Sequence, residues 1–165
     1  MKLLNQKLVI ITAISILFII LCNSANAQTE FSGTWKMDIQ KSEFGGLTSA
    51  MMYKEIKILQ NKDSLITFGM RINEDDFPTT AVSYPFNGNI VKFKLPGNRT
   101  MTSTIGWSDD GNVLNRNSSY AFADSGGYES KETWVLSEDK KELTITRTFK
   151  GGNNDATVKA VYEKQ

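Results

Sequence analysis

Hydrophobic and polar residues alternate with a period of two along most of the chain beyond residue 30. In the stretch NIVKFKL, the apolar residues Val91, Phe93 and Leu95 fall on one side of an extended chain, and two lysines fall on the other. The stretches ELTITRTF and YKEIKILQ repeat this pattern. Such alternation is typical of antiparallel strands with one face buried and one in water. The pattern therefore predicts an all-β chain.

Turn-forming residues interrupt these runs at short intervals, and Asp110-Gly111 is a strong hairpin signal because glycine tolerates the positive φ of tight turns. A long antiparallel meander exposes two edges, and closing into an up-and-down barrel of about 8–10 strands removes them. We expect at most one short helix, within residues 42–52. The strands are predicted near residues 31–38, 51–60, 64–72, 79–85, 90–95, 99–107, 113–122, 128–136, 142–149 and 156–163.

Residues 1–27 have the features of a secretory signal peptide. Lys2 and Lys7 place positive charge before an uncharged run from Leu8 to Leu21. Ala25-Asn26-Ala27 then supplies the small residues that signal peptidase requires. The run is about 14 residues long, shorter than the ~20 that span a bilayer as a helix. We therefore predict export, to a bacterial periplasm or the outside of the cell.

Cleavage after Ala27 would leave one domain, residues 28–165, a length that suits a single hydrophobic core. An alternative makes Cys22 a lipid-anchored residue, but the bulky Leu21 before it fits a lipoprotein site poorly. Cys22 is the only cysteine, so the mature domain would contain no disulfide. We expect a monomer with no stable membrane insertion after cleavage.

Composition excludes several kinds of chemistry. The chain contains no histidine, and residues 28–165 contain no cysteine. Serine–histidine and cysteine–histidine catalysis and the usual zinc, copper and haem ligand sets are therefore missing. Removing Lys2 and Lys7 changes the formal net charge from +1 to −1, which offers no electrostatic surface for nucleic acid. We expect neither an enzyme nor a cofactor.

The stretch FSGTWKMDIQKSEFGG, which begins at Phe31, carries a family resemblance. Its Gly33-Thr34-Trp35, followed by Lys36, resembles the Gly-x-Trp strand that opens lipocalins and fatty-acid-binding proteins, the calycin superfamily. The C-terminal VYEKQ is similar to the last strand of the fatty-acid-binding proteins. With ETWVLSEDKKELTITRTFKGG, the first stretch also resembles a group of small bacterial secreted lipocalin-like proteins. The resemblance implies a lipocalin-like barrel over residues 28–165.

In that superfamily the tryptophan closes one end of the barrel, and a basic side chain from a late strand lies across its ring. The resemblance assigns this structural plug to Gly33 and Trp35. Arg147 is the expected basic partner, because it shares a face with the inward residues Leu143 and Ile145. Alternation also places Ile39 on the inner face of the first strand, together with Trp35.

Two features depart from the fatty-acid-binding pattern. An Arg-x-Tyr in the last strand holds the ligand carboxylate there, whereas this chain has Ala160-Val161-Tyr162. The position of a second arginine falls near Leu136, which is apolar. About a dozen residues separate the first two predicted strands, too few for a lid of two helices. Carboxylate binding in the manner of that family is therefore not expected.

Several residues are candidates for a ligand site inside the barrel. Arg116 shares a face with Leu114 and Tyr120, where its guanidinium could hold a carboxylate or phosphate. A position at the rim of the barrel is the alternative for Arg116, and the plug is the alternative for Arg147. Aromatic residues would line the site or simply fill the core. The candidate ligand-binding residues are Arg116, Tyr120, Arg147, Tyr162, Trp107 and Trp134, with Tyr84 as a further lining residue.

The acidic clusters, residues 74–76 and Asp109-Asp110, lack the ligand spacing of a known calcium loop, so we expect no metal site. Two functions remain open from the sequence. One is a lipocalin-like protein that binds a small, largely apolar molecule inside the barrel. The other is a filled barrel that interacts with a protein partner through its surface.

The signal peptide makes a direct prediction. Expression of the full chain in a host that secretes it should give a product whose intact mass and N-terminus correspond to Gln28–Gln165. An Ala27→Leu variant, with a bulky residue at the cleavage site, should keep its N-terminal segment. A wild-type product that begins at Met1 would contradict the prediction.

Overall fold

The computed structural model describes residues 28–78, 80–95, 99–122, 126–151 and 155–165, so the predicted signal peptide lies outside the described residues. The described chain forms ten strands and one 3-10 turn. The strands are β1 (Gly33–Glu43), β2 (Glu55–Gln60), β3 (Ser64–Met70), β4 (Val82–Pro85), β5 (Val91–Leu95), β6 (Arg99–Trp107), β7 (Leu114–Ala121), β8 (Gly127–Leu136), β9 (Glu142–Lys150) and β10 (Ala156–Lys164). The turn is η1 (Ser49–Met51).

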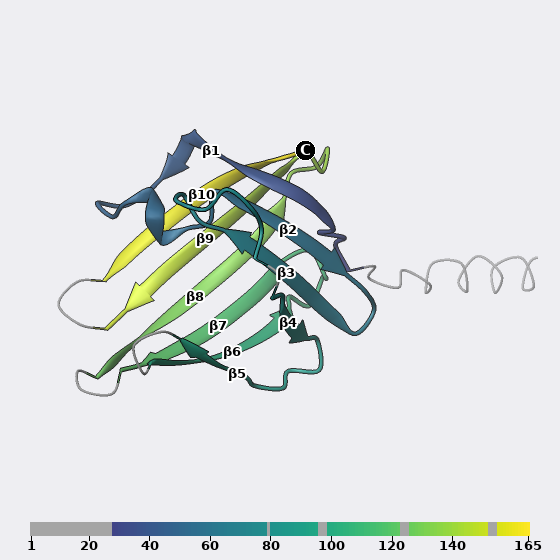
Figure 1. Cartoon of the computed structure of the whole chain (residues 1–165). Coiled ribbons are helices and arrows are strands. Elements are labelled where there is room, and N and C mark those ends of the chain that lie inside the picture. The colour runs from purple at the N-terminus through teal and green to yellow at the C-terminus, as the bar shows by residue number, and fades with distance from the viewer. Residues whose placement is uncertain (1–27, 79, 96–98, 123–125, 152–154) are drawn as a thin grey trace, which may run out of the picture.

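All ten strands belong to one antiparallel sheet, which curls into a nearly closed barrel (Figure 1). Each strand pairs with its neighbour in sequence, except that β4 and β5 form the two edges of the sheet. The first and last strands also pair, with Trp35 opposite Lys164. The predicted all-β, up-and-down barrel is confirmed.

Side chains join the two edge strands, which are not paired with each other in the described sheet. Tyr84 of β4 packs edge-on against Phe93 of β5, with ring centroids 6.0 Å apart. Phe86, just after β4, lies 5.4 Å from the ring of Trp107 on β6. The hydroxyl of Tyr84 also accepts a hydrogen bond from Arg116 of β7. The open seam of the barrel is therefore closed by aromatic contacts and one polar contact.

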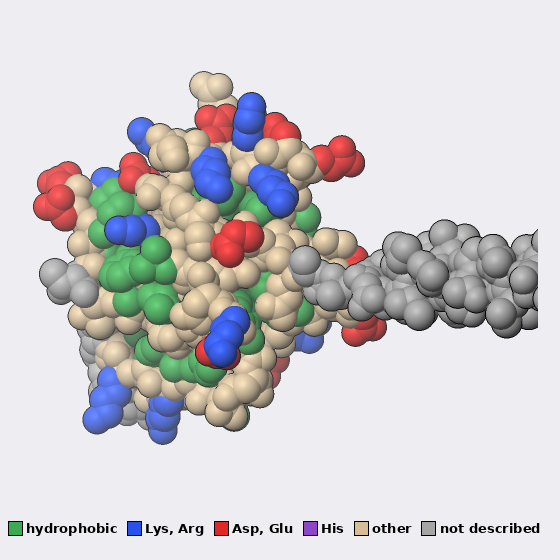
Figure 2. Space-filling view, turned by 90° about the vertical axis from the view of Figure 1, so that its right-hand side faces the viewer, with side chains coloured by type: hydrophobic (Ala, Val, Ile, Leu, Met, Phe, Trp, Pro, Cys, Tyr) green, Lys and Arg blue, Asp and Glu red, His purple; other side chains and the backbone are tan. Residues whose placement is uncertain are grey.

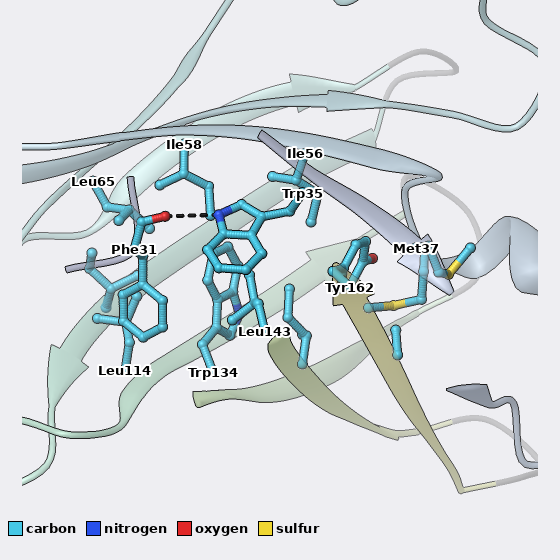
Figure 3. Packing of buried hydrophobic residues seen from close by; sticks show 14 of the residues in the cluster. Phe31, Trp35, Met37, Ile56, Ile58, Leu65, Leu114, Trp134, Leu143 and Tyr162 are labelled. Atoms are coloured by element: carbon cyan, nitrogen blue, oxygen red, sulfur yellow. Dashed lines mark hydrogen bonds between the residues drawn. The ribbon is translucent and has the colours of Figure 1, made fainter. Parts of the chain in front are cut away.

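A dense apolar core fills the end of the barrel where β1 begins (Figure 3). Trp35 is fully buried, and its indole Nε1 donates a hydrogen bond to the carbonyl oxygen of Phe31 at 2.9 Å. Phe31 stacks on Trp107 and meets the edge of Trp134. Ile58, Leu114 and Leu143 are among the other core residues with no exposed surface. We call this region the plug end.

The inner face of β1 ends earlier than the alternation predicts. Ile39 was expected to point inward, but 59% of its surface is exposed. The pairing of β1 with β10 shifts register between Asp38 and Glu43. The Asp38 carboxylate accepts hydrogen bonds from the backbone N–H groups of Gln40 and Lys41, which bends the strand locally. This irregularity turns Ile39 toward water.

The expectation of at most one short helix within residues 42–52 is confirmed, although the helical part is shorter than that range allows. The strand β1 continues to Glu43, and the helical part is limited to the 3-10 turn η1. The strand predicted from residue 51 begins at Glu55 instead. Glycines 45 and 46, both at positive φ, explain the loss of helix, because they turn the chain where a helix would have continued. The fourth strand is also shorter than residues 79–85, and residue 79 lies outside the described part.

The outer surface carries charges of both signs. On the face shown in Figure 2, basic and acidic side chains are interspersed, with hydrophobic side chains between them. Among the described residues, Leu59, Ile90 and Val135 are large apolar residues with exposed side chains. No helix in the described ranges has the length and apolar character needed to cross a membrane.

Two positions on β1 test this account of the core. Replacing the fully buried Trp35 with alanine should lower the free energy of unfolding by about 3–5 kcal/mol, because the cavity cannot be refilled. Ile39→Ala on the same strand should change it by about 0.5 kcal/mol or less. Urea unfolding followed by circular dichroism measures both values. Equal losses in the two variants would contradict the described inner face of β1.

Candidate functional site

Three charged residues lie side by side on the inner faces of β7, β8 and β9. In the strand register, Arg116 is opposite Glu132, and Glu132 is opposite Arg147. Paired residues on neighbouring strands have Cβ atoms about 5 Å apart. The register therefore brings two guanidinium groups to one carboxylate, and we call these residues the charged row.

The Glu132 carboxylate is the centre of the charged row. Its Oε1 accepts a hydrogen bond from Nη2 of Arg116 and lies 3.1 Å from Nε of Arg147. Its Oε2 accepts a hydrogen bond from the indole Nε1 of Trp134 at 2.9 Å. Both carboxylate oxygens thus have partners, although the residue is only 3% exposed.

This environment keeps Glu132 ionised. Burial alone would raise its pKa, but the positive charges of Arg116 and Arg147 and the hydrogen bond from Trp134 outweigh burial, so the pKa lies below its usual value. Burial acts against the charged form of Arg116 as well, yet the Glu132 carboxylate holds the pKa of that guanidinium above its ordinary value. The charged row therefore carries two positive charges and one negative charge at neutral pH.

Each guanidinium also reaches a second part of the barrel. Nη1 of Arg116 donates to the hydroxyl of Tyr84 at 3.0 Å, across the seam on β4. Nη2 of Arg147 donates to the hydroxyl of Tyr120 at 2.6 Å, and its Nη1 donates to the carbonyl oxygen of Met51 at 3.2 Å. These bonds hold both arginines in fixed orientations inside the barrel.

The two arginines differ from the carboxylate in their contact with solvent. The side chains of Arg116 and Arg147 keep 13% and 12% of their surface accessible, whereas that of Glu132 keeps 2%. Nε of Arg116 is buried and has no hydrogen-bond partner among the described residues. The row thus presents guanidinium groups, and not its carboxylate, to a molecule that reaches the interior.

A row of three serines runs beside the charged row. Ser103, Ser118 and Ser130 are paired across β6, β7 and β8, and all three are buried. The hydroxyls of Ser103 and Ser118 are hydrogen-bonded at 2.8 Å. The hydroxyl of Ser130 has no partner among the described residues. Together with the charged row, the serines make this wall of the barrel polar.

Aromatic and basic residues gather at the end of the barrel opposite the plug, which we call the Tyr128 end. The rings of Tyr120 and Tyr128 are stacked at 4.3 Å. Burial and the neighbouring Tyr120 raise the pKa of Tyr128, while the positive charges of Arg147, Arg99 and Arg71 act in the opposite direction. Three arginines are therefore close to this end of the barrel.

The basic partner of the plug is Lys164, not Arg147. Nζ of Lys164 lies 5.3 Å from the centre of the Trp35 ring, because the register of β1 and β10 places these residues opposite each other. Arg147 instead lies over Phe149, with 4.7 Å between guanidinium and ring centre, and beside Glu132. Gly33 has φ +145, and a Cβ atom there would meet the Lys164 side chain at 2.9 Å.

The other predicted site residues divide between wall and core. Tyr120 touches Arg147, as the charged row requires. Tyr162 is fully buried, and its hydroxyl donates to the carbonyl oxygen of Tyr53 at 3.1 Å. Trp134 is buried in the core but also binds Glu132, and Trp107 is half-buried in the aromatic contacts of the plug end. Their binding of a ligand stays a prediction.

The sequence analysis missed Glu132, the residue on which both arginines depend. The signal was present, because Glu132 alternates with Ser130 and Trp134 and therefore belongs to the inner face of its strand.

The acidic residues for which no metal site was expected include Asp110, which lies in a turn. The Asp110 carboxylate accepts hydrogen bonds from Ser108 and Asn112, which lowers its pKa to about 2. Within the described ranges, no group of three or more histidine, cysteine, aspartate or glutamate residues could hold a metal ion.

Ten antiparallel strands, joined in sequence and nearly closed around a Gly-x-Trp plug, define a calycin-like barrel. Two solved structures share this fold. Zebrafish ileal bile acid-binding protein, in complex with cholic acid, superimposes with a TM-score of 0.54 at 16% identity, over 82% of this chain and 98% of that chain. Secretory abundant heat soluble protein 4 from Ramazzottius varieornatus gives a TM-score of 0.52 at 11% identity, over 82% and 94%.

No protein-family model and no curated protein matches the sequence. The likeness to the two solved structures therefore concerns the fold alone. It confirms the predicted resemblance to the calycins at the level of architecture. The charged row has to be interpreted from its own geometry.

The charged row predicts a particular dependence of stability on pH. Glu132→Gln leaves two guanidiniums without their counter-charge and should cost about 3–5 kcal/mol of unfolding free energy at pH 7. The folded-state pKa of Glu132 is lowered, so its contribution is complete above the unfolded value of about 4.3 and is lost as the pH falls below that value. The difference between wild type and Glu132→Gln should therefore shrink below about pH 4.

Urea unfolding between pH 3 and pH 7 measures this difference. Glu129→Gln is the matched control, because Glu129 lies on the same strand but is exposed. It should change stability by about 0.5 kcal/mol or less at pH 7. An equally small effect of Glu132→Gln would show that the carboxylate does not hold the row together.

Proposed function

We propose that this protein binds a small, largely apolar molecule inside its barrel and holds the polar head of that molecule at Arg116 and Arg147. One observation carries the proposal: two guanidiniums with accessible surface lie on the inner wall, and among the described residues a single carboxylate compensates them. An interior with this much positive charge is unfavourable in an empty, purely structural barrel. A bound acidic or polar head would supply the missing partner.

The walls around the row suit the apolar part of such a molecule. Val82, Val91 and Phe93 of the seam strands are only partly buried and pack against the core. Tyr128 and the aromatic residues beside it provide a second apolar surface at the other end of the polar wall. Sites for small molecules commonly combine mostly apolar walls with a few placed polar groups.

The comparison with known structures supports the same class of function. The zebrafish protein is a bile acid-binding protein, and its structure contains cholic acid, a molecule with an apolar body and an acidic group. Because a shared fold is weak support for a shared function, we rest the proposal on the charged row. The nature of the ligand is inferred from that row alone.

We further propose that binding occurs without catalysis and outside the cytoplasm. Residues 28–165 contain neither histidine nor cysteine, the side chains that most often act as acid–base groups or nucleophiles. The signal-like residues 1–27 support export. We expect the exported protein to act as a monomer that carries its ligand.

A second candidate is a filled barrel that acts through its outer surface. The tight core of the plug end favours this alternative, because Phe31, Trp35 and Tyr162 leave no exposed surface there. In a filled barrel, Arg116 and Arg147 would serve only to tie the strands together. The two candidates differ in whether anything is bound inside.

Protein purified from the native host, after expression of the full chain, provides the test. Mass spectrometry of its organic extract should recover one small molecule in about equal amount to the protein. Arg147→Gln should lose most of this molecule, because it removes one of the two positive charges from the wall. Lys131→Ala, an exposed position on β8, is the control and should retain it.

An empty extract would not by itself decide between an unfilled site and a filled barrel, so a binding titration accompanies it. The apolar dye 1-anilinonaphthalene-8-sulfonate should bind the extracted protein with saturation. Failure of both the extraction and the titration would overturn the proposal in favour of the filled barrel.

A further inference from the structure

We infer that the interior site selects a ligand that carries one negative charge, and that Glu132 sets this preference. The inference rests on the proposed function, because it defines the head group of the molecule proposed to bind there. It goes further by assigning a role in ligand selection to a carboxylate that lies behind the arginines. The geometry of the charged row supplies the argument.

The charged row has one positive charge in excess. Arg116 and Arg147 both contact Oε1 of the single carboxylate, Glu132. Their other contacts among the described residues are to neutral groups. These are the hydroxyls of Tyr84 and Tyr120, a backbone carbonyl oxygen, and the rings of Tyr84, Trp134, Tyr120 and Phe149. Neutral groups do not cancel the second guanidinium. A ligand with one negative charge would make the row neutral.

The hydroxyl groups nearest the row do not alter this count. Ser103, Ser118 and Ser130 are neutral, and burial raises the pKa of Tyr84 and Tyr162, which keeps both hydroxyls protonated near neutral pH. Lys164 of β10 is exposed and lies at the plug end over Trp35. The excess charge of one is therefore a property of the row itself.

Several hydrogen-bond donors of this wall are not used by the described residues. A guanidinium has five N–H donors, and the buried Nε of Arg116 has no partner in the described part of the chain. Nε of Arg147 lies near Glu132 but makes no hydrogen bond of suitable geometry there, and the buried hydroxyl of Ser130 likewise has no described partner. The oxygens of a carboxylate or sulfate group accept hydrogen bonds from guanidinium N–H groups, and both arginines keep part of their side-chain surface accessible.

A head group with two negative charges fits less well. It would leave one negative charge uncompensated in the low-dielectric interior and would place it close to the Glu132 carboxylate. A neutral head group would leave the excess positive charge as it is. Glu132 thus reduces the charge of the wall from two to one, which favours a monoanion over a dianion.

Two further arginines lie near the Tyr128 end of the barrel. Arg71 and Arg99, at the Tyr128 end, are close enough for their charges to act on Tyr128 together with Arg147. Glu74 lies in the same loop as Arg71, and its carboxylate is held by the backbone N–H of that residue.

Two dodecyl amphiphiles of matched shape test the selection. Dodecyl sulfate carries one negative charge, whereas dodecyl phosphate carries two at pH 8, because the second ionisation of a phosphate monoester has a pKa of about 6. Isothermal titration of extracted wild-type protein, below the micellar concentrations, should give a Kd for dodecyl sulfate at least about tenfold lower than for dodecyl phosphate. Dodecanol should bind more weakly than dodecyl sulfate.

The same titration at pH 5.5 provides a test that needs no variant. Dodecyl phosphate is then mostly a monoanion, while the guanidiniums and the Glu132 carboxylate keep their charges and tyrosine hydroxyls stay protonated. The preference for dodecyl sulfate should fall to about threefold or less. A preference that persists unchanged would show that head-group charge is not what the site selects, and would overturn the inference.

Glu132→Gln tests the assigned role of the carboxylate. With two positive charges on the wall, this variant should bind dodecyl phosphate at pH 8 at least as tightly as dodecyl sulfate. Glu129→Gln, the exposed control on the same strand, should keep the wild-type preference. If Glu132→Gln does not fold, Arg147→Gln replaces it: its row has no excess charge, so dodecyl sulfate and dodecanol should bind within about threefold of each other.

The outcomes separate this inference from the proposed function. Tight binding of both anions at pH 8 with no preference, or a preference for the phosphate, would overturn the selection of monoanions and leave ligand binding intact. Equal binding of dodecanol and both anions would leave an apolar site without an anion anchor. Binding of none of the three would overturn the proposed function itself.

Discussion

A single buried carboxylate connects most of the polar interior of this barrel. Glu132 holds Arg116 on one neighbouring strand and Arg147 on the other, and it also accepts a hydrogen bond from Trp134. Through Arg116 the network reaches Tyr84 and the seam between the edge strands. The orientation of both arginines, and with it the whole candidate site, depends on the charge of this one side chain.

The interior is divided into an apolar end and a polar wall, and the two differ in what they contribute. The plug end buries Trp35 and its neighbours completely, which is the main source of stability in a domain of this size. A buried ion cluster contributes little net stability, since apolar residues of similar volume often serve equally well. Folding alone therefore gives little reason for the charged row, which supports the proposed role in ligand binding.

The barrel fold is shared with the calycins, whereas the positions of the interior arginines differ from the fatty-acid-binding pattern. The chain has the calycin-like barrel, yet the last strand carries Ala160 where an Arg-x-Tyr pattern would place arginine. Tyr162 is present, but its hydroxyl bonds to the backbone of Tyr53. The guanidiniums of the charged row come from β7 and β9 instead, so the proposed polar anchor lies on a different part of the barrel wall.

The sequence by itself determined the meander and the inner or outer face of most strand residues, because the period of two records burial directly. It favoured an inner position for Arg147 and left the rim open for Arg116, and the same alternation would have placed Glu132 inside. Only the tertiary structure decided which residues meet across strands. Lys164 covers Trp35, and Arg147 meets Glu132, because the register between strands depends on hydrogen-bond pairing and on local irregularities such as the one that turns Ile39 outward. Alternation along one strand carries no information about that register.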